Sequence, residues 1–186
     1  MTKPITIVAL GGSMRQRSFT RAALQTALSI AEAQGVETEL LDVRMLALPM
    51  YQPGFAISDY PAESQAGIHQ LLSGCRRASA MIWASPTYHG TISGVVKNAI
   101  DFIDFMSDDT PPYLTGRAIG LISVNDSTTF TAMMHCVHEL RGWLAPTQVE
   151  VSRNDFHEDL SVSNERTQKR LARLVDELVG FARANQ

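Results

Sequence analysis

Residues 84–105, ASPTYHGTISGVVKNAIDFIDF, form the stretch that decides the fold. The apolar run Ser79–Ala84, which leads into it, has the length and composition of a buried strand. Residues 85–91 predict a turn-rich loop. Apolar residues then recur at helical spacing, namely Ile92, Val96, Ala99, Ile100 and Ile103. A strand, a loop and a helix in this order place the loop at the carboxyl end of a strand, where open α/β sheets bind ligands.

The chemistry of loop 85–91 suits a flat ligand with polar edges. Pro86 fixes its own φ and favours extended geometry at Ser85, so the chain leaves the strand stiffly. Tyr88 offers an aromatic face, and Gly90 lets the backbone approach a ligand closely. The same features also fit an ordinary connection that contains a buried tyrosine.

A second loop of this kind follows the apolar, β-branched run Pro4–Leu10, which predicts a strand buried on both faces. The loop supplies two glycines, three hydroxyls and a guanidinium before a helix that runs from about Thr20 to Gln34. The side chains expected to hold a phosphate are those of Ser13, Arg15, Ser18 and Thr20. The loop lacks the Gly-Lys-Ser/Thr of a Walker loop and the third glycine of the dinucleotide pattern, so we expect a phosphate monoester. The alternative is a polar connection whose Ser or Thr caps the helix.

The rest of the chain repeats the alternation of strand and helix. Further strands are expected at Val36–Leu41, Arg117–Val124 and Pro146–Val151, and further helices from Pro61, at Thr131–Trp143 and at Asn164–Arg183. Five such units predict one α/β domain over residues 1–186, a flavodoxin-like three-layer sandwich with a five-stranded parallel sheet of order 2-1-3-4-5. The loops after the first, third and fourth strands then converge, which adds the polar run 125–129, with Asn125 and Ser127, to the site.

One connection is unusually long. Asp42–Tyr60 has no clear period and is rich in apolar side chains, so we expect it to lie across a neighbouring subunit or beside the ligand.

Composition excludes several classes of protein. The chain has 186 residues, 45% of them hydrophobic, and a net charge of −3, which argues against a nucleic-acid or membrane partner. It shows no apolar run long enough to span a bilayer and no signal peptide. Two cysteines on apolar helix faces fit reduced thiols in a cytoplasmic protein, with a disulfide as the alternative. His135 and His138 lack a third ligand nearby in sequence, so no metal site is expected.

Two motifs resemble those of the NADPH-dependent FMN reductase family, whose members are flavodoxin-like. They are Gly12-Ser13-x-Arg15-x-x-Ser18, and Ser85-Pro86-x-Tyr88 followed by Gly94-x-x-Lys97-Asn98-x-Ile100-Asp101. The resemblance spans about residues 4–150. It implies that the first loop, with Ser13, Arg15, Ser18 and Thr20, holds the FMN phosphate. It also implies that the isoalloxazine ring is lined by Pro86, Thr87, Tyr88, His89 and Gly90. The loop after the fourth strand is usually glycine-rich in this family. Here the loop contains no glycine, so we expect either that its side chains, including Asn125 and Ser127, replace the backbone donors or that this edge binds something different.

The resemblance also implies a function. The chain is expected to be an FMN-dependent NAD(P)H oxidoreductase that passes hydride from NADPH through FMN to a flavin, quinone or similar small acceptor by a ping-pong mechanism. The flavin carries the chemistry, so no catalytic side chain is assigned, and Arg17 is a candidate for the 2′-phosphate of NADPH. We expect a homodimer or homotetramer, with Phe102 and Phe105 as candidate interface residues. The alternative is an FMN-binding electron-transfer or regulatory flavoprotein without NADPH turnover.

Overall fold

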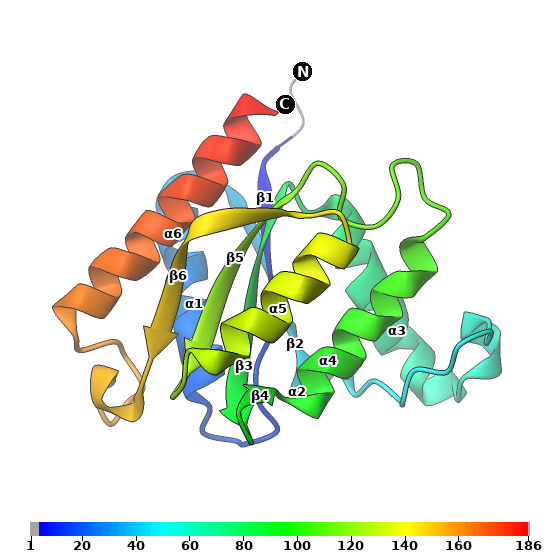
Figure 1. Ribbon diagram of the computed structural model, residues 1–186, viewed down its shortest axis with the longest axis horizontal. Helices are drawn as coiled ribbons and strands as arrows, with labels where there is room; N and C mark the ends of the chain where they lie inside the picture. The colour runs from blue at the N-terminus through cyan, green and yellow to red at the C-terminus, as the bar shows by residue number, and fades with distance from the viewer. Residues whose placement is uncertain (1–3, 186) are drawn as a thin grey trace.

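Five parallel strands form the centre of the molecule (Figure 1). The structure is a computed structural model and describes residues 4–185. The strands are β1 (Thr6–Gly11), β2 (Glu37–Asp42), β3 (Ala80–Tyr88), β5 (Ala118–Val124) and β6 (Trp143–Val151). Their order, β2-β1-β3-β5-β6, is the expected flavodoxin-like order, with one addition. The two-residue strand β4 (Thr91–Ile92) pairs antiparallel with the end of β3. The predicted fold class is therefore confirmed.

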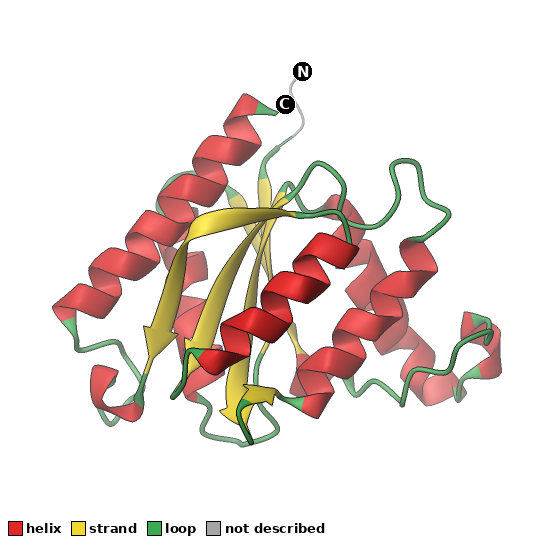
Figure 2. Cartoon of the chain, in the orientation of Figure 1, coloured by secondary structure: helices red, strands yellow, loops and turns green. Residues whose placement is uncertain are grey.

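Helices cover both faces of the sheet (Figure 2). The helices are α1 (Phe19–Glu32), α2 (Val43–Leu46), α3 (Ala62–Arg77), α4 (Gly94–Asp101), α5 (Thr128–Glu139) and α6 (Glu165–Ala184). Three short 3₁₀ helices are η1 (Ile57–Asp59), η2 (Phe102–Met106) and η3 (Arg153–Asp155). Two separate apolar cores follow: α1 and α6 pack on one face, and α2, α3, α4 and α5 on the other. No helix within residues 4–185 is long and apolar enough to cross a membrane.

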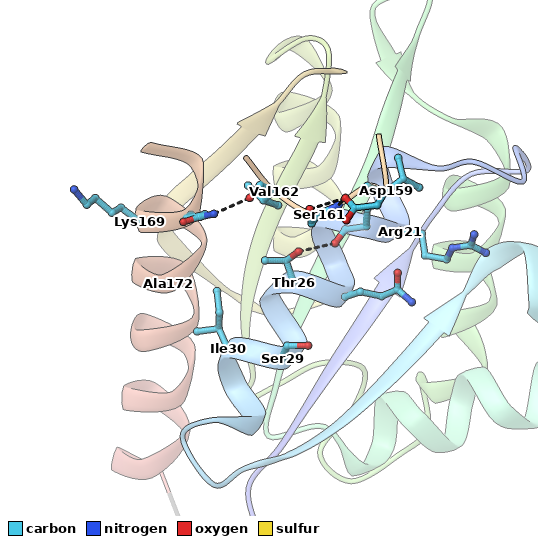
Figure 3. Close-up of a pocket in the computed structure, with 13 residues that line it drawn as sticks. Arg21, Thr26, Ser29, Ile30, Asp159, Ser161, Val162, Lys169 and Ala172 are labelled. Atoms are coloured by element: carbon cyan, nitrogen blue, oxygen red, sulfur yellow. Dashed lines mark hydrogen bonds between the residues drawn. The ribbon is translucent and has the colours of Figure 1, made fainter. Parts of the chain in front are cut away.

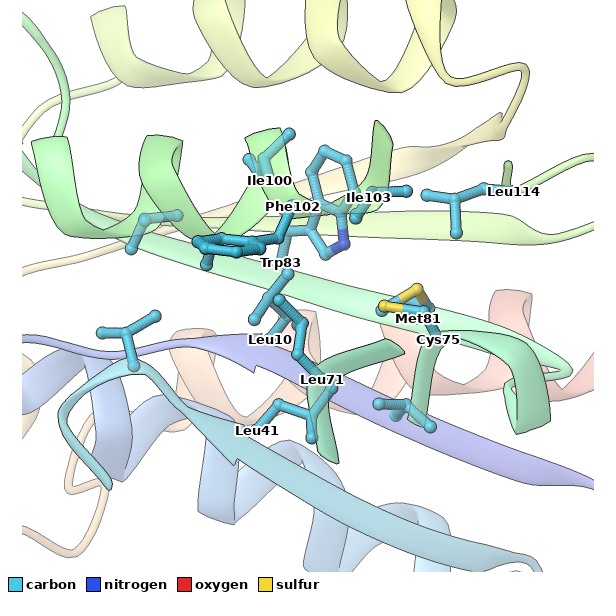
Figure 4. Packing of buried hydrophobic residues seen from close by; sticks show 14 of the residues in the cluster. Leu10, Leu41, Leu71, Cys75, Met81, Trp83, Ile100, Phe102, Ile103 and Leu114 are labelled. Carbon is cyan, nitrogen blue, oxygen red and sulfur yellow. The ribbon is translucent and has the colours of Figure 1, made fainter. Parts of the chain in front are cut away.

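The core on the α3–α4–α5 face contains two large aromatic side chains among aliphatic ones (Figure 4). Trp83 of β3 and Phe102 of η2 are both fully buried there. The expectation that Phe102 serves a subunit interface is therefore wrong. Helix α4 ends at Asp101 and a 3₁₀ helix follows, so the angle between successive side chains changes at this point and Phe102 faces the core. Phe105 is only partly buried and packs against the same core.

Several boundaries differ from those expected. Strand β3 runs on through Tyr88, so most of the expected loop 85–91 is strand. Strand β6 begins at Trp143, not Pro146, and the preceding helix is Thr128–Glu139, not Thr131–Trp143. The connection 42–60 is not structureless, because it contains α2 and η1.

The connection 42–60 is fastened to α4 by one amide side chain. The Asn98 oxygen accepts a hydrogen bond from the Tyr51 backbone N–H at 2.9 Å, and its Nδ2 donates to the Pro49 carbonyl at 2.8 Å. The Tyr51 hydroxyl donates to Asp104 at 2.6 Å, and this bond is the main reason that the pKa of Tyr51 is raised to about 12. The connection therefore lies against its own chain, although Met45 and Met50 within it stay 75% exposed.

Candidate functional site

A pocket of about 210 Å³ lies at the carboxyl edge of the sheet, between the connections that follow β1, β3 and β5. The convergence of these three connections is therefore observed. Residues from all three line the pocket: Ser13, Arg15, Arg17, Ser18, Phe19, Thr20, Pro86, Thr87, Tyr88, Val124 and Asn125.

The β1–α1 loop is shaped by two glycines with positive φ. Gly11 has φ 150° and Gly12 has φ 118°, in the region that favours glycine. A Cβ on Gly11 would lie 2.1 Å from the Ala84 carbonyl oxygen, and one on Gly12 would lie 2.8 Å from the Asp42 Oδ1 atom. The loop therefore turns tightly between β2 and β3, where a larger residue does not fit.

Buried hydroxyls follow this turn. Ser13, Ser18 and Thr20 are each at most 5% exposed and line the pocket. Ser18 caps α1, because its Oγ accepts a hydrogen bond from the Arg21 N–H at 3.1 Å. Ser18 is therefore a helix cap, as the alternative interpretation of this loop predicted, and it also lines the pocket. Arg15 is exposed, and among the described residues no carboxylate lies within ion-pair distance of it.

The carboxyl end of β3 forms the second wall. Pro86, Thr87 and Tyr88 are the last residues of the strand, and the Tyr88 side chain is 41% exposed. His89 (φ 53°) and Gly90 (φ 79°) connect β3 to β4 as a two-residue hairpin turn. Positive φ at both positions is what a type I′ turn requires. These two exposed residues follow Tyr88 in the chain and do not line the pocket.

The β5–α5 connection forms the third wall and is held by side-chain hydroxyls. The Thr87 Oγ1 atom lies 2.5 Å from Thr129 Oγ1 and 3.4 Å from Ser123 Oγ, and it donates to the Asp126 carbonyl at 3.0 Å. We call Thr87, Ser123 and Thr129 the hydroxyl cluster. Asn125 adopts φ 77°, a conformation that asparagine tolerates better than most residues. The connection thus reaches a glycine-like turn without glycine.

Charge at this connection is stabilised locally. Hydrogen bonds from the backbone and side chain of Thr128 hold the pKa of Asp126 below its usual range. The backbone bond, from the Thr128 N–H to Asp126 Oδ1, is 2.8 Å long and lies at the start of α5.

Eight of the eleven residues expected at the site line one pocket. They are Ser13, Arg15, Ser18, Thr20, Pro86, Thr87, Tyr88 and Asn125. His89 and Gly90 lie at the hairpin turn, and Ser127 lines a neighbouring cavity. Phe19 and Val124 were not expected at the site. Val124 could have been inferred, because it is the last residue of a buried strand. Phe19 could not: its ring packs against Phe156, with 5.2 Å between the ring centroids, and the sequence gives no signal for that contact.

Another cavity, of about 800 Å³, is larger than the candidate pocket and is a different feature (Figure 3). It lies between α1, α6 and residues 159–162. Polar groups in its wall already bond to one another: the Gln168 amide donates to the Val162 carbonyl, and Ser161 donates to Asp159. Its chemistry therefore offers a ligand less than the smaller pocket does. Within residues 4–185, no group of three potential metal ligands is found.

Comparisons with known proteins agree with this geometry. The family model described as NADPH-dependent FMN reductase matches residues 5–156. The chain belongs to the NADPH-dependent FMN reductase family. It is 26% identical over 184 residues to the NADPH-dependent FMN reductase ArsH of Shigella flexneri, with 96% of this chain and 69% of the relative covered. It is 28% identical over 180 residues to an FMN-dependent NADPH-azoreductase of Staphylococcus saprophyticus, with 92% of each covered.

A solved structure supports the fold. The flavoenzyme NAD(P)H:(acceptor) oxidoreductase FerB of Paracoccus denitrificans superposes with a TM-score of 0.74 at 19% identity, covering 97% of this chain and 98% of FerB. Membership of the NADPH-dependent FMN reductase family, and not this structural likeness, makes the chain an oxidoreductase with FMN as cofactor and NAD(P)H as reductant.

The residues present fit FMN. A phosphate monoester needs donors without competing carboxylates, and the β1–α1 loop offers buried hydroxyls beside Arg15. The Thr20 hydroxyl lines the pocket, and no hydrogen bond from it to any described residue is recorded. A flat ring needs an aromatic or backbone platform, which Tyr88 and the end of β3 supply.

Proposed function

We propose that the chain binds FMN in the pocket between β1, β3 and β5 and reduces a small organic acceptor, such as a quinone or a free flavin, with NAD(P)H. FMN, when bound, supplies the chemistry by accepting a hydride and passing electrons on. The observation that supports this proposal most directly is the pocket itself. It places hydroxyls, a guanidinium and an aromatic face at the carboxyl edge of a parallel sheet.

The β1–α1 loop would bind the phosphate. Ser18 and Thr20 stand at the start of α1, where free N–H groups and the helix dipole favour an anion. The Ser13 Oγ accepts a hydrogen bond from the Arg15 N–H at 3.2 Å, so this turn is already ordered and its hydroxyl proton remains available for the ligand. Arg15 supplies the positive charge, and its guanidinium can bond two phosphate oxygens at once.

The second and third walls would orient the ring. Pro86 and Thr87 present strand backbone, Tyr88 presents an aromatic face, and the turn His89–Gly90 lies at the outer side. Asn125 offers an amide to the polar edge of the ring. Fixed N–H and amide dipoles near this edge stabilise the negative charge that reduction creates.

One exposed side of the ring would serve both substrates. Tyr88 is 41% exposed, so the pocket stays open beside it. If the nicotinamide and the acceptor use the same opening in turn, the kinetics are ping-pong, and double-reciprocal plots at several acceptor concentrations give parallel lines. Intersecting lines would reject this part of the proposal.

The direct test is an absorbance spectrum of the purified protein with FMN, followed by anaerobic NADPH. We expect bound-flavin peaks that bleach on adding NADPH and return on adding a quinone. Flavin that stays oxidised with both NADPH and NADH would instead indicate the electron-carrier or regulatory alternative. Failure to bind FMN would show that the pocket serves another ligand. Arg15→Ala is expected to weaken FMN binding, whereas Arg183→Ala, at the far end of α6, is the matched control.

We also propose a homodimer or homotetramer in which exposed apolar side chains of the 42–60 connection and α4 are covered. Met45 and Met50 are 75% exposed, and Val95 of α4 is 36% exposed. Light scattering coupled to size exclusion is expected to give two or four times the mass of 20.4 kDa. A monomer would refute this.

A cytoplasmic location is proposed on the state of the thiols. Cys75 and Cys136 are both free, and Cys75 is fully buried, which fits a reducing compartment. Fractionation of the native host is expected to place the protein with cytoplasmic markers, and recovery with periplasmic markers would refute it.

A further inference from the structure

A second cavity, of about 560 Å³, lies at the carboxyl edge of the sheet beyond the flavin pocket. Its walls come from the end of β6, η3, the start of α5 and the first turns of α6. Ser127 lines this cavity, whereas Asn125, two residues earlier, lines the flavin pocket. The two cavities are therefore neighbours across one short connection.

Two arginines of α6 line the second cavity. Arg166 and Arg170 are one helical turn apart, so both side chains leave the helix on the same side. The Arg170 Nη2 atom donates to the Gln148 carbonyl, which fixes that side chain against β6. For Arg166, no side-chain hydrogen bond or ion pair with another described residue is recorded. A guanidinium pair of this kind suits a doubly charged phosphate.

The two carboxylates in the wall differ in their effect. Asp155 accepts hydrogen bonds from Ser152 N–H at 2.6 Å, Asn164 Nδ2 at 2.6 Å and Thr167 Oγ1 at 3.0 Å, so its charge is compensated within the protein. Glu150 is exposed and opposes an anion. Removing the charge of Glu150 should therefore strengthen the binding of an anion in this cavity.

We propose that this cavity binds the 2′-phosphate of NADPH through Arg166 and Arg170. The inference rests on the proposed function, because hydride transfer requires the nicotinamide at the flavin ring and leaves the adenosine end to extend past Ser127. NADH lacks the 2′-phosphate, so the site selects NADPH. The earlier candidate, Arg17, lines the flavin pocket and not this cavity.

The test measures binding of adenosine 2′,5′-bisphosphate and of 5′-AMP to the FMN-loaded protein by calorimetry. Arg166→Ala is expected to weaken the bisphosphate about tenfold, the effect of losing one charged hydrogen bond, and to leave 5′-AMP unchanged. Glu150→Gln is expected to tighten the bisphosphate. Arg173→Ala is the control, since Arg173 lies on the same helix, outside the cavity, and pairs with Glu177.

The steady-state counterpart is a fall of about tenfold in kcat/KM for NADPH in Arg166→Ala with no change for NADH. Bisphosphate binding that is absent in the parent protein, or unaffected by Arg166→Ala, would overturn the inference. If NADPH still bleaches the flavin in that case, the proposed function stands and only the subsite fails. If neither NADPH nor NADH bleaches the flavin of the parent protein, the proposed function fails whatever the binding data show. Arg166→Ala, Glu150→Gln and Arg173→Ala all change exposed side chains, and circular dichroism checks that the variants fold.

Discussion

Replacing Thr87 by valine removes the hydroxyl that joins β3 to the β5–α5 connection while keeping the shape of the side chain. Thr87 Oγ1 lies 2.5 Å from Thr129 Oγ1, and it donates to the Asp126 carbonyl at 3.0 Å. Thr129 is fully buried, so water cannot replace the lost partner. The Asp126 carbonyl keeps a second donor, Ser123 Oγ, so the connection is loosened but not released.

The size of the effect follows from these contacts. A buried hydroxyl left without its partner costs about 1–3 kcal/mol. Each kcal/mol lowers Tm by about 2–4 °C in a chain of this length. If part of this energy is needed to order Asn125 against the ring, FMN affinity falls by about three- to tenfold, since 1.4 kcal/mol is a factor of ten.

The assay is thermal unfolding with and without FMN, together with flavin fluorescence titration, for Thr87→Val and for Thr131→Val. Thr131 is exposed on α5, and no side-chain hydrogen bond from it to a described residue is recorded, so it controls for the chemical change alone. A Thr87→Val protein with the Tm and FMN affinity of the parent would refute the view that hydroxyls hold this wall. Lower Tm with unchanged FMN affinity would confine the role of the cluster to stability.

Three further outcomes are expected. Gly120→Ala should lower the free energy of unfolding by about 1–3 kcal/mol, because its Cβ would lie 2.6 Å from Leu174 Cδ1 of α6; an unchanged denaturation midpoint would contradict this. The pKa of Asp155 is lowered: burial raises it, but the hydrogen bonds to the carboxylate outweigh burial. The ionised carboxylate therefore stabilises the fold at pH values above the pKa of the unfolded state, and this stabilisation is lost as the pH falls through the lower pKa of the folded state. Asp155→Asn should therefore flatten the acid limb of a stability–pH curve, and an unaltered limb would count against it. Burial raises the pKa of Cys75 to about 12 and also raises that of the half-buried Cys136, so a thiol reagent at pH 8 should label Cys136 slowly and Cys75 only on unfolding, as peptide mapping can show.

The parallel sheet was predictable because its central strands are buried on both faces and therefore apolar throughout. The ends of the strands were not, and two prolines explain why. Pro86 suggested that β3 stops at Ala84, but the pairing of β1 with β3 ends at Ala84, while β3 continues beside β5 to Pro86. The missing N–H thus falls where one side of the strand has no partner.

Pro146 likewise led us to expect that β6 begins at this proline, whereas the strand begins at Trp143. Strand β6 lies at the edge of the sheet, so a residue without an N–H costs no ladder bond on its open side. The register between β5 and β6 also shifts between Ile119 and Leu121, which accommodates the extra residues after Leu144. A bulge of this kind leaves no pattern in the sequence, so the strand was expected to begin three residues late.

The candidate pocket was predictable to the extent that strand ends determine it. Polar residues directly after β1 and β5, and the last residues of β3, had to meet once the strand order was known. The direction of individual side chains depends on local turns. The β3–β4 hairpin moves His89 out of the pocket, and the start of α5 turns Ser127 toward the neighbouring cavity. Arg166 could not be predicted in this way, because it reaches the same edge on α6, the last helix of the chain, and not on a connection that follows a strand of the site.

The β5–α5 connection explains how this chain departs from the glycine-rich pattern and keeps the architecture. Glycine at this position would give a positive φ and nothing else, whereas Asn125 reaches φ 77° and retains an amide that lines the flavin pocket. The order that a short glycine loop lacks is supplied by hydroxyls on both neighbouring strands and on α5. Asn125 lines the flavin pocket and Ser127 lines the cavity beyond it. The conformation of residues 125–127 therefore determines how the two cavities are placed relative to each other. With side chains in place of glycine, this connection has a fixed conformation between the flavin ring and the proposed phosphate subsite. The hydrogen bonds of the hydroxyl cluster fix that conformation.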